Sequence, residues 1–129
     1  MLDSVPAVRR VDTPRADLQA FDIVGHVNSA DVENLFGLLE AAYALHPRVD
    51  VLIRMIDNEG IDWAEVAPGT IEQGRDHARR HVRRCAIIGD GSSLAAAQGL
   101  FLDATPVELR QFSPQDEEAA WAWVEEPMA

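Results

Sequence analysis

Stretches with strand-like and helix-like periodicity alternate along this chain of 129 residues, and this alternation constrains the fold more than any other feature. Five strands are predicted, over residues 7–12, 19–27, 49–57, 85–89 and 106–112. The first two are separated by a turn through Thr13-Pro14, so we expect them to form a hairpin. Before each later strand, apolar residues recur every three or four positions, which is typical of a helix.

Helices are predicted from this periodicity and from capping residues. The first runs from a cap at Asn28 or Ser29 to His46, and the second ends at about Arg84. The third runs from Leu94 to about Leu102, and the fourth begins after a cap at Ser113. Right-handed parallel crossovers are typical of strands that alternate with helices. We therefore predict an α/β fold in a single domain over residues 1–129. It is a mixed, mostly parallel five-stranded sheet with an antiparallel N-terminal edge strand and about four helices.

The composition is that of an ordinary globular protein, with 47% hydrophobic and 26% charged residues. No apolar run approaches the ~20 residues of a membrane-spanning helix, and the first residues lack the basic-then-apolar order of a signal peptide. The single cysteine, Cys85, excludes an internal disulfide and a cysteine metal cluster. We therefore expect a cytoplasmic protein with no cofactor and no metal site.

Charge is unevenly distributed. The net charge of −11 argues against nucleic acid as a partner, yet residues 75–84 contain five arginines and one aspartate. Arg75, Arg79 and Arg83 recur every four residues, so on a helix they share one face. Two interpretations stay open: a solvated face that pairs with the acidic majority, or a patch that contacts anionic headgroups, a phosphate or an acidic partner.

The loop after the third strand carries four carboxylates, on Asp57, Glu59, Asp62 and Glu65. Open α/β folds place their sites at this end of the strands. Paired carboxylates can act as general acid and base, but acidic loops are ordinary in so acidic a chain, and we expect no catalytic residue.

The same loop contains Trp63, which either packs on the core or presents its ring to a ligand or interface. With Ile61 and Val66 it is predicted to form an apolar flap, for which Gly60 and Gly69 allow a hinge. The candidate ligand-binding residues are therefore Asp57, Gly60, Ile61, Trp63 and Val66.

Two further motifs point to weaker possibilities. His77 and His81 have metal-ligand spacing on a helix, but no third ligand is evident and the neighbouring arginines would repel a cation. Residues 89–93 join a strand to a helix, as phosphate-binding loops do, but they lack the P-loop lysine, and a serine helix cap is the favoured interpretation.

Three stretches carry a family resemblance: RRCAIIGD at 83–90, the LF that ends a short helix at 100–101, and VELRQFSPQDEEAAWAWVEE at 107–126. In their order and spacing they resemble the SpoIIAA-like family of STAS domains, which are also grouped as STAS or CRAL-TRIO-like. The resemblance implies a cytoplasmic bacterial domain, often a homodimer, that associates with a membrane or binds an apolar ligand between sheet and helices.

True SpoIIAA switch proteins, which this family resembles, carry after the central strand a serine that accepts phosphate from an anti-sigma kinase. Here the matching residues are Asp57-Asn58-Glu59-Gly60, and no serine or threonine occurs between Ala30 and Pro68. We therefore predict a non-catalytic domain that binds an apolar or amphipathic small molecule or a peripheral membrane surface, with Arg75, Arg79 and Arg83 on headgroups or on the acidic end of the ligand. The alternative is a protein-interaction or regulatory module, related to anti-sigma-factor antagonists but without the phosphoacceptor serine, with exposed tryptophans as anchors.

Overall fold

The computed structural model describes residues 7–57, 59–90 and 108–126. Their strands form one sheet in chain order: β1 (Val8–Val11), β2 (Leu18–Val24), β3 (Val49–Ile56), β4 (Val82–Ile88) and β5 (Glu108–Phe112). β1 is antiparallel to β2, and each later strand is parallel to its neighbour. The predicted mixed sheet with an antiparallel N-terminal edge strand is confirmed.

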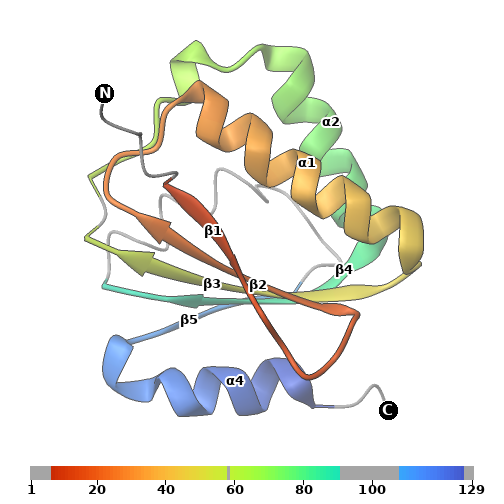
Figure 1. Cartoon of the computed structure of the whole chain (residues 1–129), viewed down its shortest axis with the longest axis vertical. Helices are drawn as coiled ribbons and strands as arrows, with labels where there is room; N and C mark the ends of the chain where they lie inside the picture. The colour runs from red at the N-terminus through yellow and green to blue at the C-terminus, as the bar shows by residue number, and fades with distance from the viewer. Residues whose placement is uncertain (1–6, 58, 91–107, 127–129) are drawn as a thin grey trace.

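Helices cover both faces of this sheet (Figure 1). α1 (Ser29–Leu45) and α2 (Pro68–His81) lie on one face, and α4 (Glu117–Glu125) lies on the other. Within the described ranges there are three α-helices, against about four predicted. The helix expected over 94–102 and the candidate phosphate loop from residue 91 onward lie outside those ranges. None of the helices described is long and apolar enough to cross a membrane.

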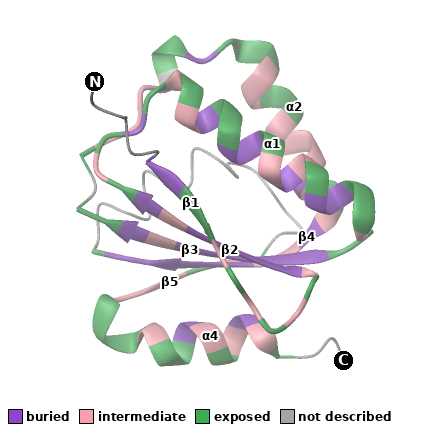
Figure 2. Cartoon of the chain, viewed as in Figure 1, coloured by how far each residue is buried: buried purple, intermediate pink, exposed green. Residues whose placement is uncertain are grey.

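α1 shows how local sequence signals specify an element. Asn28 is its cap: its side chain accepts from the Asp31 N–H at 2.9 Å, and the Asp31 carboxylate accepts from the Asn28 N–H at 3.1 Å. The predicted stripe is buried against the sheet (Figure 2) at Val32, Leu35, Phe36, Leu39, Ala42 and Tyr43. Its last predicted member, His46, is instead half-buried and caps the end of the helix. The cap sets where the chain leaves β2 and enters the helix, next to the loop that follows β3.

α1 and α2 approach each other closely at one point. The backbone of Gly74 in α2 lies so close to Phe36 in α1 that an added Cβ would stand 2.8 Å from the Phe36 ring. The buried side chains of α1 continue into one cluster with those of the sheet. Glycine at position 74 therefore permits a close approach of helices that any side chain would prevent.

α2 ends earlier than the periodicity predicts. The helix stops at His81, and β4 starts at Val82, which pairs with Val49 and is buried. The prediction of a helix to about Arg84 was wrong, because arginine is a good helix former and local propensity gives way to strand pairing with β3. Arg83 therefore does not share a helix face with Arg75 and Arg79.

α4 is attached to the second face of the sheet by apolar and ionic contacts. Ala120 and Val124 are fully buried. Arg54 of β3 donates to both carboxylate oxygens of Asp22, at 2.5 and 2.9 Å, and to Glu117 at 3.0 Å. The Asp22 carboxylate raises the pKa of Arg54, which keeps this guanidinium charged beneath the helix.

Candidate functional site

Two loops lie side by side beyond the carboxyl ends of β2 and β3, and backbone hydrogen bonds join them. The N–H groups of Gly25, Val27 and Asp62 donate to the carbonyls of Ile56, Gly60 and Val27, at 2.9, 3.0 and 2.9 Å. Val27 and Ile61 also form a parallel β-bridge. Strand pairing between β2 and β3 thus continues into the loops and restrains the segment that the sequence suggested as a mobile flap.

Positive φ angles fold these loops back. Gly25 and Gly60 have φ of 69° and 99°, and Asp57 has φ of 49°. Within the described ranges Asp57 is the one non-glycine residue of this kind, and aspartate tolerates that conformation better than most side chains. A non-glycine residue in this region of φ and ψ is a feature often found at functional sites.

The predicted ligand-binding residues divide between core and surface. Val66 is buried, and Ile61 is half-buried and packs against the main core cluster. Asp57 is exposed, as are Glu59 and Glu65. Trp63 opens a short 3-10 turn (Trp63–Glu65), and its side chain lies outside what the structure describes. Apolar residues of the segment therefore face inward and its carboxylates face solvent.

We call the four carboxylates Asp57, Glu59, Asp62 and Glu65, carried on these hydrogen-bonded loops, the acidic platform. His26 joins it from the loop after β2: Nε2 lies 2.8 Å from Oδ2 of Asp62, and Nδ1 lies 3.4 Å from the Glu59 carbonyl oxygen. The hydrogen bond to Asp62, and next the Glu59 carbonyl, raise the pKa of His26. Sequence reasoning missed this pair, because the partners stand 36 positions apart.

The His26–Asp62 pair predicts a measurable pH dependence. Because the His26 pKa is raised, the stabilisation it contributes is complete below the ordinary histidine pKa of about 6.5 and is lost as pH rises through the raised value. We expect Asp62→Asn to lower the His26 pKa in an NMR titration, and Glu65→Gln to leave it unchanged. A His26 pKa that Asp62→Asn does not alter would contradict the assignment.

The arginine-rich segment 75–84 is divided by the end of α2. Arg79 and Arg80 contact Asp76 on the same helix, at 3.4 and 3.2 Å, and remain partly exposed. Arg83 instead binds Asp50 and is largely buried. Of the three predicted contact arginines, Arg75 and Arg79 therefore belong to the surface of α2, and Arg83 belongs to a different site.

The two histidines of α2 face α1. Nδ1 of His77 bonds to the Glu40 carboxylate, and the His81 ring stacks on Tyr43 with centroids 4.7 Å apart. Nδ1 of His81 also lies 3.1 Å from the Pro47 carbonyl oxygen. In the ranges described, no group of three or more His, Cys, Asp or Glu residues is arranged to hold a metal ion.

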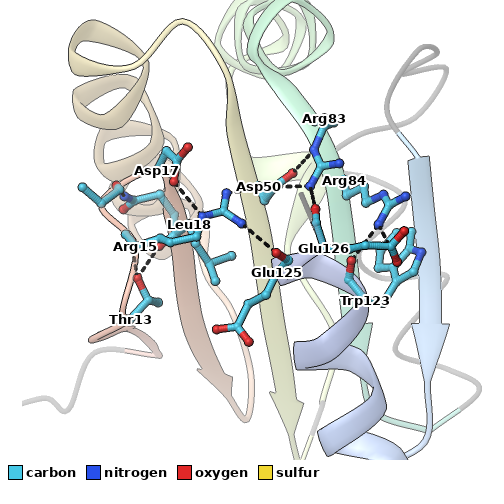
Figure 3. Close-up of polar contacts among 12 residues, drawn as sticks. Thr13, Arg15, Asp17, Leu18, Asp50, Arg83, Arg84, Trp123, Glu125 and Glu126 are labelled. Atoms are coloured by element: carbon cyan, nitrogen blue, oxygen red, sulfur yellow. Dashed lines mark hydrogen bonds and ion pairs between the residues drawn. The ribbon is translucent and has the colours of Figure 1, made fainter. Parts of the chain in front are cut away.

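A cleft of about 260 Å³ opens at the opposite end of the sheet, where β3 and β4 begin. The hairpin turn between β1 and β2, the starts of β3 and β4 and the end of α4 converge on it (Figure 3). It is lined by Arg15, Asp17, Arg48, Val49, Asp50, Arg83 and Glu125.

Asp50 is the centre of this cleft, and its side chain is only 3% exposed. Arg15 donates to it at 2.7 Å, and Arg83 donates through Nε at 2.9 Å and Nη2 at 3.0 Å. The same guanidiniums donate to the carbonyls of Glu125 and Glu126, at 3.3 and 2.6 Å (Figure 3). One buried carboxylate thus holds two arginines that satisfy the end of α4, where cations are favoured.

Arg15 is fixed from the turn side as well. Its Nε donates to Asp17 at 2.8 Å, and this bond raises the pKa of Arg15 and lowers that of Asp17. Thr13 organises the turn, because its hydroxyl, which has one hydrogen to donate, lies 2.5 and 2.7 Å from the carbonyl oxygens of Arg15 and Leu18. The sequence pattern does not predict this cleft, because Asp50 lies within an apolar run that is typical of a central strand.

Comparison with known proteins gives the family. The model of the SpoIIAA-like family matches residues 18–125. This chain belongs to the SpoIIAA-like family. The SpoIIAA-like domain is also similar to the crystal structure of an uncharacterised protein of the DUF3478 family from Shewanella loihica, which has a SpoIIAA-like fold. The TM-score is 0.68 at 23% identity, over 96% of this chain and 98% of that one, which shows a shared fold. No curated protein matches the chain.

Asp57 and Glu59 of the acidic platform belong to the segment that the sequence resemblance matched to a switch segment. In this SpoIIAA-like domain the segment begins at Asp57 and offers no hydroxyl group, since serine and threonine are absent between Ala30 and Pro68. A carboxylate on Glu59 is a poor copy of a phosphate group, which carries about twice the charge.

Proposed function

We propose that this SpoIIAA-like domain is a non-catalytic protein-interaction module whose binding surface is the acidic platform. The observation that carries the proposal is the set of backbone hydrogen bonds between the two loops, which hold exposed carboxylates in a defined arrangement. A surface ordered before binding loses little conformational entropy when a partner docks. Its negative charge favours a partner with a basic surface and accelerates their encounter.

An apolar pair borders the platform. Val24 and Ile56 end β2 and β3, are paired in register, and are 38% and 39% exposed. They directly precede Gly25 and Asp57, with which the two loops begin. Protein interfaces combine an apolar centre with a polar rim, and these residues place both kinds of surface together.

The apolar-ligand alternative has less support. Its proposed flap residues Ile61 and Val66 pack into the core, and the contact between Gly74 and Phe36 leaves no space between α1 and α2 at that point. A carrier of an apolar molecule needs an apolar cavity of several hundred Å³. Ile61 and Val66 line neither the cleft at Asp50 nor the hollow of about 270 Å³ between α1 and α2.

Site-directed photo-crosslinking in the source cells tests the proposal. A photo-crosslinking amino acid replaces Glu59 on the platform or, as the control, Glu33 on the exposed side of α1. We expect a discrete crosslinked product from position 59 only, reduced at least about tenfold by the added changes Asp57→Asn and Asp62→Asn. A product of twice the mass of the chain identifies a second copy as the partner. Equal products from both positions, or none from position 59, overturn the proposal.

A second candidate function is association with an anionic membrane through α2. The observation in its favour is that Arg79 and Arg80 are 40% and 69% exposed on one helix in a chain of net charge −11. We expect Arg79→Glu with Arg80→Glu to abolish cosedimentation with phosphatidylglycerol vesicles. The matched control changes Arg9 and Arg10, which are exposed on β1, to glutamate and is expected to retain binding. If both variants lose vesicle binding equally, binding depends only on net charge, and α2 is not a specific membrane-binding surface.

A further inference from the structure

We propose that the His26 imidazole is a charge switch on the acidic platform: when the ring loses a proton, the platform binds a basic partner more tightly. The inference rests on the interaction function proposed for the platform and names how that function is regulated. His26 lies on the loop between β2 and α1, and its side chain is 52% exposed. A partner that docks on the platform therefore meets this imidazole together with the carboxylates.

The hydrogen bonds of His26 require two ring protons. Nε2 lies 2.8 Å from Oδ2 of Asp62, and Nδ1 lies 3.4 Å from the carbonyl oxygen of Glu59. A carboxylate and a carbonyl oxygen accept hydrogen bonds and cannot donate them, whereas a neutral imidazole has a single N–H. Only the doubly protonated ring, which is positively charged, can donate to both oxygens. The geometry is therefore that of an imidazolium.

The charges that face His26 favour its proton. Its own loop, residues 25–28, contains no other ionisable side chain. Among the residues described, the Asp62 and Glu59 carboxylates act on it from the loop after β3. The hydrogen bond to Asp62, and next the Glu59 carbonyl, raise the His26 pKa above the ordinary value of about 6.5. The ring therefore changes its charge above that pH, in the range where histidine acts as a switch.

Loss of the proton changes the charge of the platform and leaves its backbone framework in place. Protonated His26 offsets one of the four negative charges of the platform. The loops stay joined after deprotonation, because the N–H groups of Gly25, Val27 and Asp62 donate to backbone carbonyls and not to the ring. Lysine and arginine side chains of a partner keep their charge over the same pH range. Binding therefore strengthens as pH rises through the His26 pKa.

The test measures binding of a fluorescent decalysine peptide to the whole chain at about pH 6 and about pH 8.5, at constant ionic strength. We expect tighter binding at the higher pH. His26→Gln is expected to reduce the ratio of the two affinities by about threefold, the effect of one partly screened surface charge. The matched control is His46→Gln, at the other end of the 17-residue helix α1. It lies beyond the screening length of about 10 Å and is expected to keep the wild-type ratio.

Two further variants separate the switch from the function on which it rests. Glu59→Gln with Glu65→Gln removes two charges of the platform and is expected to weaken peptide binding by about tenfold at both pH values. Glu33→Gln with Glu118→Gln, at exposed positions on α1 and α4, changes the net charge equally and is expected to retain binding. If the two double variants bind equally, the platform is not the binding surface, and both proposals fail. If only the platform variant is weakened but His26→Gln keeps the wild-type ratio, the charge switch alone is overturned.

Discussion

Replacing Asp50 with alanine is expected to lower the free energy of unfolding by about 3–5 kcal/mol, the usual effect of removing one partner from a buried ion pair. The loss is large because Arg83 is only 14% exposed and would keep its charge without its carboxylate. Arg15 would lose the bond that directs it to the Glu125 carbonyl. The end of α4 would therefore be weakened together with the starts of β3 and β4.

Urea unfolding followed by circular dichroism measures this effect, and Asp17→Ala is its control. Asp17 also binds Arg15, but its side chain is 44% exposed. Exposed ion pairs contribute about 0–1 kcal/mol, so we expect a small loss. If Asp50→Ala costs no more than Asp17→Ala, the buried network is not what holds α4 in place.

Phe21→Ala is expected to destabilise the domain by a similar amount, about 3–5 kcal/mol, since a buried phenylalanine leaves a cavity when truncated. Phe21 is fully buried in β2, between strand neighbours Arg10 and Ile53, and belongs to the cluster beneath α1 and α2. Its neighbours are held in regular strands and cannot close the gap.

The same truncation at Phe112 provides the comparison. Phe112 ends the edge strand β5 and is only half-buried, against Trp123 at a centroid distance of 5.9 Å. Truncation at Phe112 removes less buried apolar area than truncation at Phe21. We therefore expect the free energy of unfolding to fall by about 1–2 kcal/mol. If thermal or urea unfolding shows that both truncations lower the free energy of unfolding equally, Phe21 contributes no more to the core than the half-buried Phe112, and the prediction is wrong.

The acidic platform and the cleft at Asp50 lie at opposite ends of the parallel strands. The acidic platform follows the carboxyl ends of β2 and β3, and the arginine-lined cleft precedes β3 and β4. Asp50 lies at the start of β3 and Asp57 directly follows its end, yet Asp57 is exposed and Asp50 is buried. A partner on the platform would therefore not contact the residues of the cleft.

Local signals were sufficient for most elements and for part of the platform. The cap at Asn28 and the stripe from Val32 to Tyr43 need only neighbours within a few positions, and both are found in the structure. The acidic loop was expected at the end of β3, because a strand end and a cluster of carboxylates can both be recognised in the sequence. The inward orientation of Ile61 and Val66 was not expected. An apolar residue in a loop gives the same sequence pattern whether its side chain packs on the core or faces solvent.

Residues whose roles depend on distant partners could not be assigned in this way. Arg83 is the clearest case: a run of arginines at helical spacing predicted an exposed face, and strand pairing of Val82 with Val49 turned Arg83 onto Asp50. His26 meets Asp62 across 36 positions, and Arg15 meets Asp50 across 35.

Periodicity and capping residues thus specify which elements form and in what order, because those preferences arise within a few residues of chain. The charge balance of the arginine cleft and the rigidity of the acidic platform depend on contacts that exist only after the strands have paired. A buried carboxylate such as Asp50 is stable solely because two cations reach it in the folded state, and no local pattern in the sequence records that condition.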